Sequence, residues 1–476
     1  MRIAITTFFQ SQTNYGQLLQ AFALQQVLMR MGHFPYIIRY GFHESLPLTL
    51  GMEPIEPNFD KLLDKAKWEV AKSGCSANRY FDDFRQNHLN LSKNAYNHLE
   101  EIQLFPPIAD CYLTGSDQVW AQLLSYIDNQ IYFLNFGPEN ILRISYAPSF
   151  SLKSYPPELN GQLKECLNRF DAISVREKTG IDICKNVGSN AKWVADPTML
   201  LDGDYYRRLA KESQMELPVN YMFVYHVNVK REDFPFWSDF NRYNFNQGIR
   251  AIAVHANGEG QSDIEFIENA EYFYPSIQDW IRIIDGSQYV LTTSFHGMIF
   301  SILLHKPFFV GLRPESMFAG NDRIISVLAD LGLQKRIITD DMNLQKIMQE
   351  PINWNEVDEK LEAIRSVSLA FLKEHLGCKK GAWEIQQWKQ YCLEEVNKFI
   401  FSKRKEKEIY EQRFLQIQQQ NVALQQQTSE LQREIESLNA ERNRLIQKKK
   451  KYLNIGRWLI GLLIVSFVLV IFSYAS

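Results

Sequence analysis

The stretch "YVLTTSFHGMIFSILLHKPFFV" at residues 289–310 places a histidine and a glycine between two apolar runs. The first run has strand character and the second has helix character, so we expect His296 where a strand ends and a helix begins. Free N–H groups and the helix dipole make that place an anion site, and a histidine there can exchange a proton near neutral pH. Gly297 would let a ligand approach the backbone closely. The alternative is that Ser294 caps the helix and His296 only packs.

The first turn after a predicted strand, "FFQSQTNYGQLLQ", carries Asn14, Tyr15 and Gly16 ahead of a helix. It lacks the three-glycine fingerprint of dinucleotide-binding folds, so we expect no nicotinamide or flavin cofactor. Its polar side chains suit hydrogen bonds to a sugar or a phosphate. Ordinary capping of the helix is the alternative.

A second polar group, in "YLTGSDQVWA", places Gly115, Ser116 and Asp117 at another strand end, with Trp120 shortly after. A carboxylate there could deprotonate a sugar hydroxyl, and an indole face can stack on a sugar ring. A capping aspartate and a core tryptophan are the alternative.

Two arginines are candidates for binding an anionic substrate. Arg176 and Glu177 follow the predicted strand in "AISVREKTG", and Arg323 begins the helix in "NDRIISVLADLGL". A guanidinium fork binds two oxygens of a carboxylate or phosphate at once. For the first arginine, an Arg–Glu surface pair is the alternative.

Three further positions are weaker candidates. Asp196 stands before a proline in "VADPTMLL", which predicts a turn without a functional role. His226 and His255 each end a predicted strand, and we keep both as minor candidates for a cleft.

Strand and helix patterns alternate through the first 400 or so residues, which predicts parallel sheets with helical crossovers. We expect an α/β fold of two Rossmann-like, doubly wound domains. The N-terminal domain would span 1–205, with a helical insertion at 41–105 that includes helices near 58–72 and 78–87. The C-terminal domain, with closing helices, would span 206–400. Ligands bind such folds at the carboxyl ends of the strands, where the polar motifs lie.

The C-terminal segment has a different pattern. Residues 405–447 contain an apolar residue at every seventh position, which predicts a parallel coiled coil and a homodimer, with Asn421 fixing the register. A solitary charged helix is the alternative. Residues 456–475 are uncharged apart from Arg457 and follow a run of lysines, which predicts a single transmembrane anchor with the preceding domains in the cytoplasm. The seven-residue repeat comprises Tyr410, Ile417, Leu424, Leu431, Leu438 and Leu445.

Composition excludes other classes of function. A net charge of −3 over 476 residues provides no basic surface for nucleic acid, and no nucleic-acid motif is present. The six cysteines are scattered, without His or Cys partners at metal-ligand spacing, so we expect reduced thiols and no metal site.

Taken in order, six motifs resemble the polysaccharide pyruvyl transferase family: "NYGQLLQAFALQQVLMRMGH", "LTGSDQVW", "SVREKTG", "VADPTMLL", "SFHGMIFSILLHKPFFV" and "NDRIISVLADLGL". The resemblance covers roughly residues 1–335. It implies a fold similar to B-type glycosyltransferases and transfer of pyruvate from phosphoenolpyruvate onto two sugar hydroxyls as a ketal. His296 matches the acid of the family and Arg176 matches a donor-binding position. Many members carry an arginine where this chain has Ser294.

From these features we expect a membrane-held transferase that modifies a surface or lipid-linked glycan, with His296 and Asp117 as catalytic residues. Phosphoenolpyruvate would be the donor substrate, and no cofactor or metal would be needed. One alternative is a nucleotide-sugar glycosyltransferase on the same fold. The other is a membrane-tethered scaffold that has lost catalysis.

Overall fold

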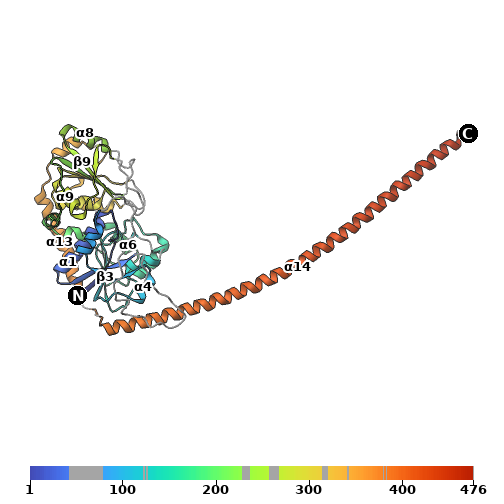
Figure 1. Cartoon of the computed structure of the whole chain (residues 1–476), viewed down its shortest axis with the longest axis horizontal. Helices are drawn as coiled ribbons and strands as arrows, with labels where there is room; N and C mark the ends of the chain where they lie inside the picture. Colours follow the sequence, from blue (N-terminus) through green and yellow to red (C-terminus); the bar gives the residue numbers. More distant parts are fainter. Residues whose placement is uncertain are drawn as a thin grey trace. The chain divides into compact units, whose positions relative to one another are not determined.

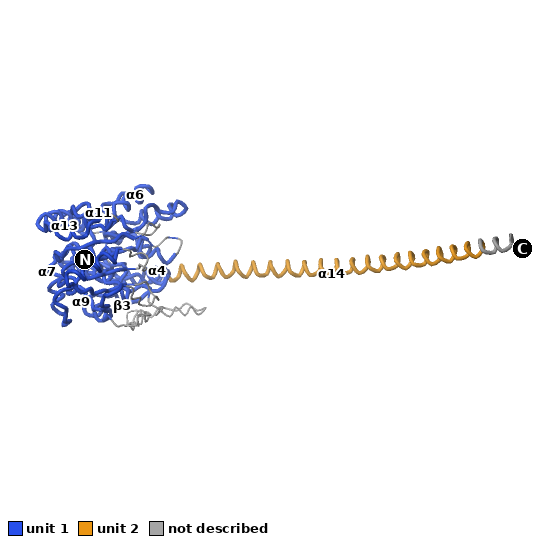
Figure 2. The backbone as a smooth tube through the Cα atoms, turned by 90° about the horizontal axis from the view of Figure 1, so that it is seen from above, with its two compact units in different colours: residues 1–395 blue, residues 396–476 orange. Residues whose placement is uncertain are grey.

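The computed structural model places the chain in two compact units, Met1–Glu395 and Val396–Ser476 (Figure 2). Side chains are described as far as residue 466. The residues that the structure describes are 1–41, 79–121, 124, 127–227, 236–256, 267–313, 320–339, 342–378, 380–381 and 383–474.

The first unit contains a five-stranded sheet in which every pairing is parallel. The strand order reverses between β1 and β4, which in such sheets marks the place where a ligand crevice forms. Helix α1 (Tyr15–Arg30) follows β1, and Asn14 caps it by accepting a hydrogen bond from the N–H of Gln17. In spatial order the strands are β3 (Leu91–Tyr96), β2 (Phe34–Tyr40), β1 (Arg2–Thr6), β4 (Cys111–Thr114) and β5 (Leu142–Ser145).

A second five-stranded sheet repeats this order later in the same unit, again with every pairing parallel. Figure 1 shows this sheet at the label β9. All seven residues of β8 are buried, as expected for a parallel strand covered on both faces. In spatial order the strands are β10 (Ala270–Tyr272), β9 (Arg250–Ala256), β8 (Tyr221–Val227), β11 (Val290–Thr292) and β12 (Phe308–Val310).

One hydrophobic core joins the two sheets. It includes Ile3 of β1, Leu18 of α1, Phe223 of β8 and Trp280 of α9. Helix α1 contacts both α9 (Ile277–Gly286) and α10 (Phe295–Leu303). The carboxyl ends of the two sheets are therefore held in a fixed relation by packing rather than by a linker alone.

The remaining helices and short strands cover the sheets. Described 3-10 turns lie at Ile127–Phe133, Pro157–Leu159, Pro197–Leu200 and Gln334–Arg336. The other elements are α3 (Phe81–His88), α4 (Leu99–Leu104), α5 (Asn160–Leu167), β6 (Ser174–Val175), α6 (Lys178–Asn186), β7 (Lys192–Trp193), α7 (Gly203–Ala210), α8 (Trp237–Gln247), α11 (Asp322–Leu331), α12 (Leu344–Gln349), α13 (Trp354–Leu376) and α14 (Ile385–Tyr474).

The predicted α/β fold with two doubly wound parallel sheets is confirmed. The predicted insertion at 41–105 lies partly outside the described residues, including its helix near 58–72. Its second helix is present as α3, but Leu91–Tyr96 form the edge strand β3 rather than part of a helical insertion. The sequence "LSKNAY" has too little apolar alternation to reveal a strand. The predicted domain boundary near residue 205 stays a prediction.

Helix α14 begins inside the first unit and continues through the second. Trp388 and Cys392 are buried. From residue 399 to residue 466, the side chains are exposed or partly exposed. Tyr410, Leu424 and Leu431 of the heptad repeat are among the exposed ones. In this single chain the coiled coil is not shown, and it stays a prediction.

The predicted membrane anchor is not supported by the structure. Within the described part of the chain, no helix combines the length and the apolar character needed to cross a membrane. Only 456–466 of the predicted segment have described side chains.

Candidate active site

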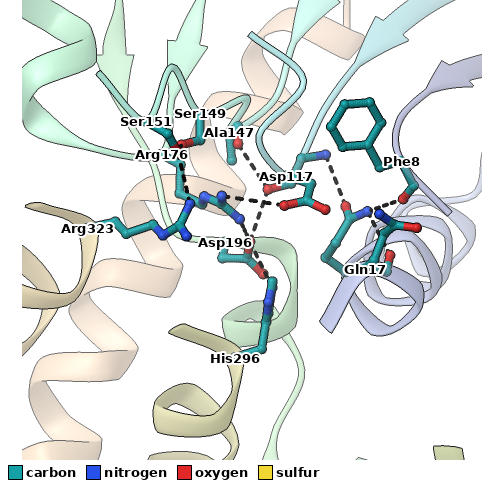
Figure 3. A network of polar contacts seen from close by, with 12 residues as sticks. Phe8, Gln17, Asp117, Ala147, Ser149, Ser151, Arg176, Asp196, His296 and Arg323 are labelled. Carbon is teal, nitrogen blue, oxygen red and sulfur yellow. Dashed lines mark hydrogen bonds and ion pairs between the residues drawn. The ribbon is translucent and has the colours of Figure 1, made fainter. Parts of the chain in front are cut away.

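The predicted site histidine lies beside a buried carboxylate from another part of the chain (Figure 3). His296 is the second residue of α10, directly after β11. Its Nε2 lies 3.6 Å from Oδ2 of Asp196, which precedes the 3-10 turn Pro197–Leu200. The histidine is only 7% exposed and the aspartate 1%. The imidazole therefore faces a polar group within the protein rather than packed hydrocarbon.

Asp196 is held as an anion by four neighbours. Its Oδ2 lies 3.0 Å from Nη1 of Arg176 and 3.0 Å from Oγ of Ser116. Its Oδ1 accepts hydrogen bonds from the backbone N–H and the hydroxyl of Thr198, at 3.0 and 2.7 Å. Burial alone would raise the pKa of Asp196, but the interactions with His296, Arg176 and Thr198 outweigh burial and hold that pKa well below its usual value. The carboxylate of Asp196 is therefore placed to orient the ring of His296.

Gly16 gives the imidazole its space. A Cβ atom on Gly16 would lie 2.0 Å from Nδ1 of His296 and 2.3 Å from its Cγ. Any side chain at position 16 would therefore push the ring away from Asp196. This contact explains why the "NYG" motif at the start of α1 and the "SFHG" motif at the start of α10 belong to one site.

Arg176 lies between two carboxylates. Besides Asp196, its Nη2 is 3.7 Å from Oδ1 of Asp117. Burial lowers the pKa of Arg176, but its carboxylate neighbours outweigh burial and raise that pKa above the usual value. Its guanidinium also lies over the ring of Phe295, 5.1 Å from the centroid, and that of Arg323 lies 5.7 Å from the same centroid. The two arginines are thus positioned by one aromatic ring.

A cavity of about 580 Å³ is lined by Arg323 and Glu177, but not by His296, Asp196, Arg176 or Asp117. Its walls come from the segments after β5, β6 and β12 and from the start of α11, so both halves of the first unit contribute. Three of its lining residues are basic: Lys153, Arg313 and Arg323. A cavity with cations at the carboxyl ends of two parallel sheets is suited to an anionic ligand.

Two of these cations lack a carboxylate partner. Within the described ranges, neither Arg313 nor Arg323 forms an ion pair. Arg313 donates to the carbonyl of Val227 at 3.0 Å, and Arg323 donates to Oγ of Ser151 at 3.0 Å and contacts the side-chain amide of Gln118. Burial, with the nearby guanidinium groups of Arg176 and Arg313, lowers the pKa of Arg323 to about 9. A bound anion would relieve this repulsion.

Several predicted site residues have a structural role instead. Tyr15 is buried and stacks on Trp280 with ring centroids 5.2 Å apart, and its hydroxyl donates to the carbonyl of Pro275. Trp120 is buried and stacks on Phe133 at 5.2 Å, so the alternative of a core tryptophan describes it better than a sugar platform. Neither ring is available for stacking on a ligand in this conformation.

The small residues of the motifs provide caps and close contacts. Ser294 caps α10 by accepting a hydrogen bond from the N–H of Gly297 at 3.3 Å. A Cβ on Gly297 would lie 2.3 Å from Oγ1 of Thr292, and one on Gly115 would lie 2.0 Å from the carbonyl oxygen of Tyr146. These glycines let elements pack closely around the site.

The two minor histidine candidates lie together but away from the cavity wall. His226 and His255 occupy paired positions on β8 and β9 with ring centroids 5.6 Å apart, and both are buried. Burial, together with His255, lowers the pKa of His226 to about 3.

The site also contains residues that the sequence analysis missed or gave no role: Asp196, Thr198, Ser149, Ser151 and Gln20. Of these residues, only Asp196 could have been recognised from the sequence, because it follows a predicted strand, as the predicted site residues do.

The family of the chain follows from comparison with known proteins. The polysaccharide pyruvyl transferase family model matches residues 14–313, which is more than half of the chain. The chain belongs to this family, as the six motifs indicated. No curated protein matches it significantly.

The solved structures that match this chain include three whose titles name UDP, a UDP-N-acetylglucosamine 2-epimerase or a glycotransferase. The S. aureus MnaA–UDP complex is 12% identical, covering 80% of this chain and 100% of that chain with a TM-score of 0.42. A UDP-N-acetylglucosamine 2-epimerase from Rickettsia bellii is 9% identical, covering 79% and 99%, with a TM-score of 0.43. The glycotransferase of kitacinnamycin is 12% identical, covering 79% and 99%, with a TM-score of 0.39. These TM-scores are low, and the fold described above rests on the chain's own two sheets.

Proposed function

We propose that this chain transfers pyruvate from phosphoenolpyruvate onto two hydroxyls of a glycan, forming a cyclic ketal, with His296 as the general acid. The observation that carries the proposal is the buried pair of His296 and Asp196, which connects through Arg176 and Phe295 to Arg323 on the wall of the cavity. Membership of the family supports the reaction class. The acceptor would be a surface or lipid-linked saccharide.

The donor carries a phosphate and a carboxylate, so its site needs several cations. Arg313 and Arg323 on the cavity wall would bind these groups, since neither forms an ion pair with a described carboxylate. The position of Arg323 also matters for Ser294, which stands where many family members have an arginine. The guanidinium of Arg323 comes from α11 and lies over Phe295, the residue next to Ser294. A cation from another helix would thus supply what position 294 lacks.

The chemistry needs one acid and one base. His296, charged beside Asp196, would donate its proton to the methylene carbon of the donor, which becomes a methyl group and leaves a cationic centre at the adjacent carbon. The first sugar hydroxyl attacks that centre, and its proton passes through a base to the phosphate, which leaves with the electrons of its C–O bond. The second hydroxyl then closes the ketal, and its proton recharges the histidine.

Release of inorganic phosphate from phosphoenolpyruvate tests the proposal. The full chain is incubated with the donor and a panel of methyl glycosides, and His296→Gln is compared with the wild type. We expect release that depends on a glycoside and falls by at least about a hundredfold in the variant. A thermal-shift comparison with UDP-sugars provides the contrast. Stabilisation by UDP-sugars but not by phosphoenolpyruvate would instead support a glycosyltransferase.

We propose further that residues 405–447 pair with the same segment of a second chain. The support is the row of apolar residues at every seventh position of α14. In the single chain three of these side chains are more than half exposed: Leu424 (64%), Leu431 (58%) and Leu438 (59%). A second copy would bury this row, and Asn421 at a core position would favour a parallel, two-stranded arrangement.

A further inference from the structure

Glu177 is a cavity residue whose two carboxylate oxygens have different surroundings. It lies between β6 and α6, is 2% exposed and lines the 580 Å³ cavity. Its Oε1 accepts hydrogen bonds from the backbone N–H groups of Phe150 and Ser151, at 2.6 and 3.2 Å. These two bonds fix the carboxylate on the cavity wall.

The second oxygen of Glu177 has no such partner. Among the residues that the structure describes, Oε2 is buried and accepts no hydrogen bond. A buried carboxylate oxygen without a donor is costly, and a ligand that brings a hydroxyl would remove that cost. Glu177 lines the cavity, so a group bound there is our candidate for the missing donor, although the oxygen itself is buried in this conformation.

The other carboxylates near the cavity are already engaged. Asp196 is fully buried among His296, Arg176, Ser116 and Thr198, as described above. Asp117, the predicted base, lies 3.7 Å from Arg176 and is not among the residues lining the cavity. Asp322 lines the cavity but accepts a hydrogen bond from the hydroxyl of Thr179 at 3.0 Å.

Glu177 is also close to the cation assigned to the donor. Ser151 connects them, because its N–H donates to Glu177 and its hydroxyl accepts from Arg323. A hydroxyl that donates to Oε2 would therefore lie beside an anion bound by Arg323. A base and an electrophile must be adjacent in this way for the hydroxyl oxygen to attack as its proton leaves.

We infer that Glu177, rather than Asp117, binds the attacking hydroxyl of the acceptor saccharide and takes its proton. This inference rests on the proposed function. In the step, the O–H bond of the hydroxyl breaks toward Oε2 while its oxygen forms a bond to the cationic carbon of the protonated donor. The proton then moves from Oε2 to the departing phosphate, so Glu177 is an anion again at the end of each turnover.

The variant Glu177→Gln tests this role with little structural change. The amide oxygen of glutamine can still accept from the two N–H groups, but the side chain cannot take a proton. Phosphate release is measured with the full chain, phosphoenolpyruvate and the methyl glycoside that the wild type uses fastest. We expect turnover to fall by about 10²- to 10⁴-fold, with phosphoenolpyruvate binding by calorimetry unchanged or tighter. The acidic limb of the pH–rate profile should be lost as well.

Two further variants make the result decisive. Asp117→Asn compares the two possible bases, and we expect it to retain more activity than Glu177→Gln. Glu271→Gln, at an exposed carboxylate paired with Arg250, is the matched control and should retain wild-type turnover. If Glu177→Gln retains turnover within about threefold, or Asp117→Asn alone removes the acidic limb, the inference is overturned and the proposed function survives. If the wild type neither binds phosphoenolpyruvate nor releases phosphate, the proposed function fails and this role falls with it.

Discussion

Replacing Asp196 by asparagine should separate electrostatic support of His296 from simple packing. The substitution keeps the shape of the side chain and removes its charge. Two unit charges 3.6 Å apart, at an effective dielectric constant of about 20, attract by roughly 4–5 kcal/mol. If the variant ring is held less well for proton transfer, a loss of ~3 kcal/mol in stabilisation of the transition state corresponds to about a hundredfold in rate. We therefore expect Asp196→Asn to lower kcat by a hundredfold or more.

The pH–rate profile of phosphate release provides the assay for this effect. A general acid must be protonated, so activity declines above some pH. We therefore compare kcat of Asp196→Asn with that of the wild type at each pH along this profile. Because the variant also leaves Arg176 with one carboxylate fewer, thermal unfolding and phosphoenolpyruvate binding must be measured alongside.

A second variant protects the test against misfolding. Ser116→Ala removes one hydrogen bond to Asp196 and keeps the charge, so it should cost about tenfold or less and leave the position of the decline unchanged. If folded Asp196→Asn works within threefold of the wild type with the same pH profile, the reasoning about this ion pair is refuted.

Four other outcomes follow from the structure. Gly16→Ala should displace His296 and reduce turnover at least tenfold, with a loss of about 1–3 kcal/mol in the free energy of unfolding measured by urea titration. The pKa of Asp196 is lower in the folded protein than its ordinary value of 3.8. Ionised Asp196 should therefore contribute its full stabilisation above pH 3.8, and this contribution should decline as the pH falls below 3.8. Arg323→Gln should weaken phosphoenolpyruvate binding at least tenfold by calorimetry. Leu431→Asp should convert a dimer to a monomer in analytical ultracentrifugation.

Three of these outcomes have a stated result that would count against them. Urea titrations of Asp196→Asn should show a shallower loss of stability between pH 6 and pH 3 than the wild type, and parallel curves would contradict the assigned pKa direction. Arg242→Gln, at an exposed arginine of α8, should leave donor binding unchanged, and equal binding by Arg323→Gln would remove Arg323 from the donor site. A monomeric wild-type chain would exclude the coiled-coil pair.

Much of the site could be predicted because parallel strands bring their carboxyl ends to one edge. Gly16, Ser116, Arg176 and His296 each follow a predicted strand, so topology alone gathers them although up to 280 residues separate them in the sequence. No local pattern reveals which of two polar residues at a strand end faces inward. That choice depends on contacts such as the one between Gly16 and the imidazole ring.

Other features could not be read from local patterns. Asp196 precedes a proline and was interpreted as a turn, and it does cap one, yet its second oxygen reaches His296 from a distant segment. Trp120 and Tyr15 have the residue types of a sugar platform, but apolar neighbours from other elements bury them. The edge strand β3 is polar enough that only its pairing with β2 defines it.

Formation of the ketal in deuterated water tests the role of His296 most directly. Protonation of the methylene carbon by an exchangeable acid predicts one deuterium in the new methyl group, detected by mass spectrometry of the purified glycan. We expect the wild type to give this product and His296→Gln to give almost none. A variant that forms the deuterated ketal at the wild-type rate would contradict the account.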